Sequence, residues 1–167
     1  THGRLAEPAE LIEGMLRIGK QAPMLLEQPR PELLPWGELG VDLVLECSGH
    51  FRSHAGASRH LQAGAEKVII GAVPFDLADQ IVVYGVNHED VRDDSRVLSA
   101  ASCTTHCIAP LLQRLDQQYG IQQVLMKEIH AYTSDQTLLD HVHRDPRRGR
   151  AGAQNIVPTT SSAIGAV

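Results

Sequence analysis

The chain has 167 residues, enough to bury a hydrophobic core, and 43% of them are hydrophobic, as is ordinary for a globular protein. Its formal charge of −5 argues against a nucleic-acid partner, and the sequence contains no apolar run approaching the ~20 residues that span a bilayer, which argues against a membrane protein. Three cysteines, an odd number, do not indicate a disulfide framework, so we expect a reducing, cytoplasmic setting.

The first part of the chain is weakly patterned. Residues 10–18 predict short strands joined at Gly14, and residues 29–35, with three prolines, predict a loop that ends before Trp36. Residues 1–4 lack the apolar run of a signal peptide and lack an initiator methionine. We therefore expect the chain to begin within a longer protein.

The clearest unit lies between residues 41 and 72. Residues 41–47 form a short apolar run bounded by glycines, typical of a buried parallel strand, and a Ser48-Gly49 turn follows it. Residues 53–63 have apolar side chains at helical spacing, and residues 67–72 form another apolar run. This order of strand, turn, helix and strand predicts a βαβ unit. Further strands are predicted at residues 80–87 and 96–100.

The pattern then changes. Apolar residues at helical spacing predict a helix that begins at Cys103, packs one face on a core and ends at Gly120. That apolar stripe consists of Ile108, Leu111, Leu112 and Leu115. Residues 122–132 predict a strand, and residues 133–157 predict a long irregular loop. Residues 159–162 are four hydroxyl residues in a row and predict the start of another helix.

These elements predict an α/β fold class in two parts. Residues 1–101 have the pattern of part of a doubly wound α/β domain, and residues 102–167 that of the start of an α+β domain. This division would place Cys103 at a domain boundary, where ligand sites are common.

Cys103 is the first candidate for chemistry. It stands where a strand-like stretch meets the predicted helix, and a helix N-terminus favours the negative charge of a thiolate. His130 lies on the next predicted strand, from which its imidazole could take or give the thiol proton. The competing interpretations are a small buried apolar cysteine and a structural strand histidine.

No metal site is expected. Cys103 and Cys107 form a C-x3-C pair, and His141 and His143 form an H-x-H pair. Neither pair has the further ligands at close spacing that a zinc site needs.

Several motifs, taken together, resemble the phosphorylating glyceraldehyde-3-phosphate dehydrogenases. Residues 101–111 (ASCTTHCIAPL) match the active-site signature of that family, residues 130–136 its catalytic-histidine strand, and residues 143–151 its S-loop. Further matches, in the order of the family, are residues 1–4, 34–36, 40–42, 46–49, 85–88 and 155–160. The resemblance covers essentially the whole chain.

The resemblance implies a partial Rossmann-type NAD(P)-binding domain in residues 1–101 and the first part of an α+β catalytic domain in residues 102–167. It implies oxidation of glyceraldehyde 3-phosphate to 1,3-bisphosphoglycerate through a cysteine thiohemiacetal and thioester, with NAD or NADP as cofactor, in a homotetramer. Because the sequence lacks the Gly-rich turn that cradles the cofactor pyrophosphate, we expect an interior fragment that is inactive alone. The alternatives are erythrose-4-phosphate dehydrogenase, another divergent paralogue, or a catalytically incompetent fragment.

The matching positions imply roles for individual residues. Cys103 would be the nucleophile and His130 the general base. The resemblance implies inorganic-phosphate ligands at Ser102, Thr104 and Ser161, and substrate-phosphate positions for the sugar-phosphate aldehyde at Thr133 and Asp135. It implies cofactor contacts at strand ends, at Ser48, Gly49, Phe51, Gly71 and Ala72. Helix capping by Thr104 and Thr105 and an ordinary tight turn at Gly49 stay open as alternatives.

Two features leave details open. Three arginines that lie close together in the expected S-loop, Arg147, Arg148 and Arg150, could bind phosphate, but surface charge of this kind is more often solvated or at a subunit interface. The sequence also departs from the family pattern at His106, Ser134, Ser162 and Gly165. None of these departures removes the thiol or the imidazole.

Overall fold

A computed structural model describes residues 3–12 and 15–166. The chain opens with an antiparallel hairpin of β1 (Ala9–Ile12) and β2 (Met15–Ile18), in which Ala9 pairs with Ile18. The predicted pair of short strands is therefore confirmed, and its expected joint at Gly14 lies outside the described residues. Most side chains of this hairpin are exposed, so it does not contribute to the core.

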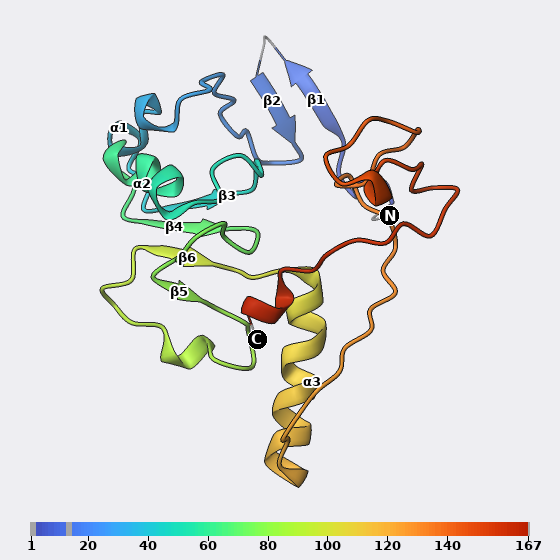
Figure 1. The fold of residues 1–167 in the computed structure, drawn as a ribbon. Coiled ribbons are helices and arrows are strands. Elements are labelled where there is room, and N and C mark those ends of the chain that lie inside the picture. Colours follow the sequence, from blue (N-terminus) through green and yellow to red (C-terminus); the bar gives the residue numbers. More distant parts are fainter. Residues whose placement is uncertain (1–2, 13–14, 167) are drawn as a thin grey trace.

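The centre of the molecule is a parallel sheet with strand order β3-β4-β6-β5, seen in Figure 1. Its strands are β3 (Leu43–Glu46), β4 (Lys67–Ile70), β5 (Gln80–Ile81) and β6 (Val97–Ser99). The register aligns the last residues of neighbouring strands, Glu46 with Ile70 and Ile70 with Ser99. The carboxyl ends therefore meet at one sheet edge, and the predicted βαβ unit and α/β class are confirmed.

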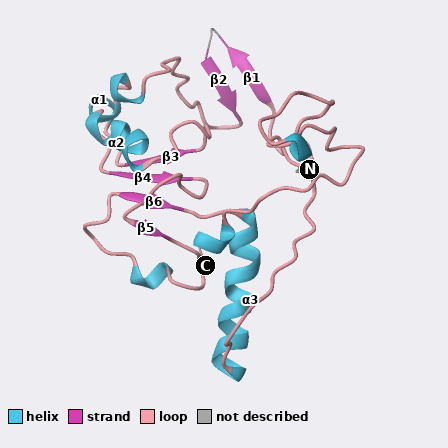
Figure 2. Ribbon diagram, viewed as in Figure 1, coloured by secondary structure: helices cyan, strands magenta, loops and turns pink. Residues whose placement is uncertain are grey.

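Helix α2 (His54–Gln62) packs its buried Ala57 against the sheet residues Val44, Val68, Ile70 and Val97. It begins where predicted because Ser53 Oγ accepts a hydrogen bond from Gly56 N at 3.0 Å and so caps the first turn. A short helix α1 (Trp36–Leu39) precedes the sheet and ends at Gly40, whose φ of 63° is left-handed. Figure 2 shows both helices beside β3 and β4.

The strand predicted over residues 80–87 is wrong beyond Ile81. The side-chain amide of Asn87 donates to Ile81 O at 2.9 Å and accepts from Val83 N at 2.8 Å, so it takes the backbone groups that a longer strand would pair. Gly85, with a φ of 85°, then turns the chain away from the sheet.

Helix α3 (Cys103–Tyr119) is the longest helix of the described residues and ends before Gly120, whose φ is 70°. Its predicted start and end are confirmed, and it continues through Pro110. The expectation that its apolar stripe packs on a core is wrong in part, because Leu111 is 57% exposed and Leu115 39% exposed.

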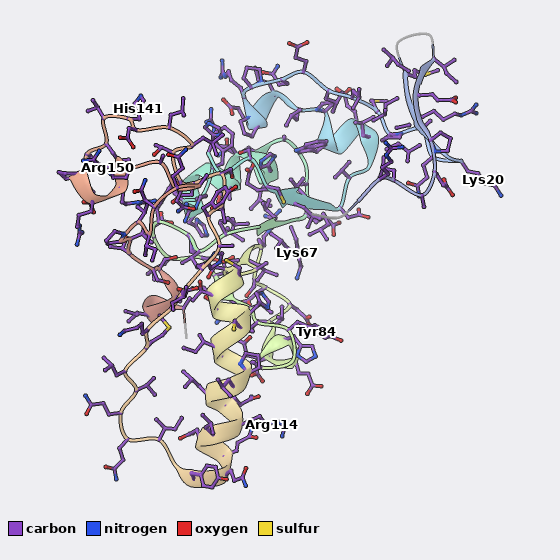
Figure 3. All side chains as sticks on the ribbon, turned by 90° about the vertical axis from the view of Figure 1, so that its right-hand side faces the viewer. Lys20, Lys67, Tyr84, Arg114, His141 and Arg150 are labelled. Carbon is purple, nitrogen blue, oxygen red and sulfur yellow. The ribbon has the colours of Figure 1, made fainter. Side chains whose placement is uncertain are left out.

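The strand predicted over residues 122–132 is wrong. This segment is extended and runs beside α3, but within the described residues no backbone hydrogen bond pairs it with another strand. Figure 3 shows its side chains spread outward next to the helix that carries Arg114, and Leu125 and Ile129 are 97% and 95% exposed. The irregular loop predicted over residues 133–157 is confirmed.

Residues 159–162 do not open an α-helix; a single 3-10 turn, Ala163–Gly165, follows them. The other 3-10 turns are Pro31–Leu33, His88–Asp90 and Pro146–Arg148. The division into two domains between residues 101 and 102 stays a prediction.

Candidate active site

A strained turn leads from the sheet to Cys103. The chain leaves β6 at Ser99 and passes through Ala101, whose φ of 55° is in the left-handed region that residues other than glycine seldom occupy. Ser99 holds this turn, because its Oγ accepts a hydrogen bond from Ala101 N at 3.0 Å and donates one to Ala72 O at 2.8 Å. No sequence pattern singled out Ser99, because its contact with Ala72, far away in the sequence, follows no helical or strand period.

Cys103 is the first residue of α3, as predicted. The preceding residue, Ser102, caps the helix, since its Oγ accepts a hydrogen bond from Thr105 N at 3.2 Å. Three residues into the helix, the His106 ring donates from Nε2 to Ala100 O at 2.8 Å and so ties the first turn back to the sheet. Cys103 is exposed, so its interpretation as a buried apolar residue is wrong.

The structure brings His130 to the thiol. Sγ of Cys103 lies 3.2 Å from Nε2 of His130, although the two residues are 27 positions apart. The other ring nitrogen, Nδ1, lies 2.5 Å from Ala131 O. A carbonyl oxygen can only accept, so Nδ1 carries a hydrogen, and Nε2 is the nitrogen that exchanges a proton with the sulfur.

The two groups shift each other's pKa. The hydrogen bond with His130 lowers the pKa of the Cys103 thiol. Partial desolvation of the sulfur opposes this, and the backbone N–H of Thr104 at the helix start adds to it. The pKa of His130 is raised, first by its hydrogen bond to Ala131 O and then by the neighbouring sulfur. Together these shifts favour a thiolate–imidazolium pair, a more reactive nucleophile than a neutral thiol.

A carboxylate lies beside this pair. Thr104, which follows Cys103 in the helix, donates from Oγ1 to Glu128 Oε1 at 2.6 Å. Glu128 also contributes, after the hydrogen bonds and the sulfur, to the raised pKa of His130. No sequence motif singled out Glu128. The signal that points to it is its spacing of two from His130, since residues i and i+2 share a side of an extended segment.

The expected cofactor residues lie at the carboxyl edge of the sheet. Ser48 and Gly49 follow β3, and Gly71 and Ala72 follow β4, so the parallel register brings both pairs to one edge. Gly49 has a φ of 78° and is exposed, which keeps this turn narrow and open. Phe51 instead lies half-buried, edge-on to a histidine ring of α2 at 6.3 Å between centroids.

A buried polar network, which no sequence motif indicated, lies behind this edge. Trp36 Nε1 donates to His60 Nδ1, and His60 Nε2 lies against Glu46 Oε2, each at 3.0 Å. Glu46 Oε1 in turn accepts hydrogen bonds from N and Oγ of Ser48, the former at 2.8 Å. Burial opposes ionisation of Glu46, but the bonds from Ser48 and His60 outweigh it and lower the pKa of this carboxyl.

Two family models and many curated proteins match the sequence of this chain. Residues 102–167 match the family model for the glyceraldehyde 3-phosphate dehydrogenase C-terminal domain, and residues 1–54 match the model for the NAD binding domain of the same enzyme. The chain belongs to the glyceraldehyde-3-phosphate dehydrogenase family. Along its full length it is 52% identical to the glyceraldehyde-3-phosphate dehydrogenase of Pseudomonas aeruginosa, 45% to that of Kitasatospora aureofaciens and 43% to that of Mycoplasma pneumoniae. It spans about half the length of these curated relatives.

The remaining phosphate positions implied by the glyceraldehyde-3-phosphate dehydrogenase resemblance lie in the irregular part of the chain. Thr133 N and Oγ1 both donate to the side-chain oxygen of Gln136, at 2.7 and 3.1 Å, and Asp135 forms an ion pair with Arg148. Ser161 Oγ accepts from Ala163 N at 3.2 Å. Within the described residues no hydrogen bond joins these side chains to Cys103, so their roles in phosphate binding stay predictions.

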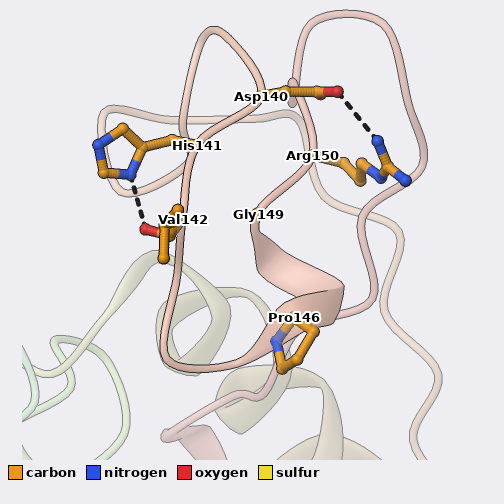
Figure 4. Close-up of a pocket in the computed structure, with 6 residues that line it drawn as sticks. All are labelled: Asp140, His141, Val142, Pro146, Gly149 and Arg150. Atoms are coloured by element: carbon orange, nitrogen blue, oxygen red, sulfur yellow. Dashed lines mark hydrogen bonds and ion pairs between the residues drawn. The ribbon is translucent and has the colours of Figure 1, made fainter.

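The region expected to be the S-loop of glyceraldehyde-3-phosphate dehydrogenases contains an open hollow of about 380 Å³ (Figure 4). It is lined by Asp140, His141, Val142, Pro146, Gly149 and Arg150. Three of the four arginines of residues 143–151 pair with carboxylates: Arg147 with Asp145, Arg148 with Asp135 and Arg150 with Asp140. Neither Cys103 nor His130 lines this hollow, which is therefore separate from the thiol.

No cluster of three or more metal-ligating side chains occurs among residues 3–12 and 15–166. His141 and His143 turn their Nδ1 atoms to the nearby backbone rather than to a common point. In the same described part of the chain, no helix combines the length and the apolar character that a membrane crossing needs.

Proposed function

We propose that this chain carries the catalytic centre of a glyceraldehyde-3-phosphate dehydrogenase, which oxidises the aldehyde to 1,3-bisphosphoglycerate with inorganic phosphate and a nicotinamide cofactor, NAD or NADP. The observation that carries the proposal is the 3.2 Å approach of the Cys103 thiol to His130 Nε2 at the start of α3. Family membership of the chain supports the substrate and the cofactor. The homotetramer and the cytoplasmic setting are part of the same proposal.

One proton accounts for the first half of the reaction. His130 takes the thiol proton at Nε2, and the Cys103 thiolate attacks the aldehyde carbon, which forms a C–S bond and an alkoxide. The imidazolium returns the proton to that oxygen, which gives the thiohemiacetal and leaves His130 neutral. The Nδ1 hydrogen bond to Ala131 O keeps Nε2 facing the reacting atoms throughout.

The same nitrogen then acts as a base. When bound, the cofactor supplies a hydride acceptor for the C–H bond of the thiohemiacetal. As that bond breaks, His130 Nε2 takes the hydroxyl proton, and a thioester of Cys103 results. An oxygen of inorganic phosphate attacks the thioester carbon, the C–S bond breaks, and sulfur leaves as the thiolate that the helix start and the imidazolium stabilise.

The sheet edge fits the cofactor that the family implies. The turns after β3 and β4 lie side by side, the Gly49 turn is exposed with no atom close to where a side chain would project, and parallel sheets bind nucleotides at this edge. The residues that would hold the cofactor are Ser48, Gly49, Phe51, Gly71 and Ala72.

The test compares two cysteines of one helix in the full-length enzyme. Cys103→Ser is expected to abolish reduction of the cofactor by glyceraldehyde 3-phosphate, because an alcohol is a far weaker nucleophile than a thiolate. Cys107→Ser, one turn further along α3, is the matched control and is expected to retain turnover. Normal turnover of Cys103→Ser would exclude the covalent mechanism.

The substrate is tested separately. Steady-state rates with glyceraldehyde 3-phosphate and with erythrose 4-phosphate are compared in the wild-type enzyme. A higher kcat/KM for the four-carbon aldehyde would reassign the chain to the sister dehydrogenase.

A further inference from the structure

We propose that Glu128 is a specificity-determining residue of the acyl-acceptor site, where it weakens the binding of inorganic phosphate next to Cys103. The inference rests on the proposed function, because it concerns the site at which phosphate attacks the thioester.

The Thr104 hydroxyl can donate a hydrogen bond to only one partner at a time. A threonine hydroxyl has a single hydrogen to donate, and Thr104 Oγ1 donates it to Glu128 Oε1 at 2.6 Å. Thr104 is one of the hydroxyls expected to bind inorganic phosphate. While it is engaged with Glu128 it can only accept, and an anion offers mainly acceptors.

The charge of Glu128 also opposes the approach of an anion. Glu128 lies within hydrogen-bond reach of the residue adjacent to the nucleophile, so a phosphate that approaches the Cys103 thioester must approach a carboxylate. Like charges a few ångströms apart repel, and the repulsion doubles for a phosphate dianion. By contrast, the same carboxylate favours the thiolate–imidazolium pair, because its charge helps to raise the pKa of His130.

Glu128 therefore has opposite effects on the two halves of the reaction. Glu128 supports the imidazolium that pairs with the thiolate, and it disfavours the anion that must later displace the sulfur. A thioester that phosphate reaches slowly is open to water, whose attack breaks the C–S bond and releases a carboxylate, the Cys103 thiol and one proton.

The experiment separates charge from hydroxyl engagement in the full-length enzyme. Glu128→Gln keeps an acceptor for Thr104 but removes the charge, whereas Glu128→Ala removes both. Glu89→Gln, an exposed glutamate of the turn His88–Asp90, is the matched control.

The first readout needs no cofactor. Alkylation of Cys103 by iodoacetamide is followed by peptide mass spectrometry while inorganic phosphate is raised and ionic strength is held constant with sodium chloride. For Glu128→Gln we expect half-protection at a phosphate concentration about tenfold lower than in the wild type, and lower again for Glu128→Ala. Glu89→Gln is expected to match the wild type.

The second readout separates this proposal from the proposed function. The pre-steady-state burst of reduced cofactor reports thioester formation and needs no phosphate, whereas the steady-state KM for phosphate reports its attack. We expect a burst in every variant and a KM for phosphate about tenfold lower in Glu128→Gln. An unchanged phosphate dependence with a normal burst overturns the role of Glu128. A missing burst in the wild type counts against the dehydrogenase, and the protection assay still decides the role of Glu128.

Discussion

Removal of the Glu46 carboxylate is expected to destabilise the α/β part of the chain strongly. Glu46 and His60 are only 6% and 5% exposed, and the carboxylate accepts from His60 on one oxygen and from Ser48 on the other. In Glu46→Ala these donors lose their acceptor inside the protein. Leaving a buried donor without its acceptor costs about 1–3 kcal/mol of unfolding free energy, so we expect a loss near the upper figure from His60, whereas Ser48 can turn to water.

The assay is urea unfolding of the chain, followed by far-ultraviolet circular dichroism and by the fluorescence of Trp36, its one tryptophan. Trp36 reports on this network directly, because its indole N–H donates to His60 at 3.0 Å. Glu38→Ala, an exposed glutamate of α1, is the control and is expected to change the unfolding free energy by less than ~0.5 kcal/mol. Equal midpoints for Glu46→Ala and Glu38→Ala would refute the reasoning.

The pH dependence of this difference has a defined sign. The folded pKa of Glu46 is lowered, so its stabilising contribution is complete above the unfolded value of about 4.3. It declines as the pH falls through the lower folded pKa. The difference in unfolding free energy between the wild type and Glu46→Ala should therefore become smaller in acid and stay constant near neutral pH. A gap that widens in acid would mean that the carboxylate is not the stabilising form.

Three further results are expected. The pH midpoint for alkylation of Cys103 should lie below the ~8.5 of a free thiol, and His130→Asn should move it upward. A pH series of iodoacetamide rates measures this midpoint, and an unchanged midpoint in His130→Asn would disprove the coupling between the thiol and the imidazole. Ser102→Ala should cost about 1 kcal/mol of unfolding free energy through loss of the cap on α3, and equal urea midpoints would contradict this. Asn87→Ala should cost about 1–3 kcal/mol because it orphans two backbone groups, whereas the exposed neighbour Glu89→Ala should have little effect in the same assay.

The regular elements of the fold could be predicted because their signals are local. Apolar runs bounded by glycine placed β3 and β4, and a capping serine with helical spacing placed α2. The prediction failed where a side chain competes with the backbone, as Asn87 does beyond Ile81. It failed again over residues 122–132, because a strand pattern describes a half-buried segment but does not provide its partner.

The candidate site was predictable to a similar extent. The motif around Cys103 and the strand-like run around His130 pointed to the pair that the structure brings within 3.2 Å. Glu128 and the buried pair of Glu46 and His60 were not found. Their contacts join polar residues that lie 24 and 14 positions apart, and such spacings follow no helical or strand period.

Cys103 is held by more contacts to the rest of the fold than His130 is, and this difference affects the pKa shifts of the pair. Cys103 is fixed by a capped helix and a turn pinned by Ser99, whereas the hydrogen bonds of His130 are to Ala131 and to the thiol itself. By linkage, the imidazolium stabilises the thiolate by as much as the thiolate stabilises the imidazolium. Thiolate formation therefore also holds the ring in place. In the proposed reaction, that attraction is lost once sulfur bonds to the aldehyde carbon. The hydrogen bond from Nδ1 to Ala131 O then keeps Nε2 directed at the hydroxyl whose proton it would take.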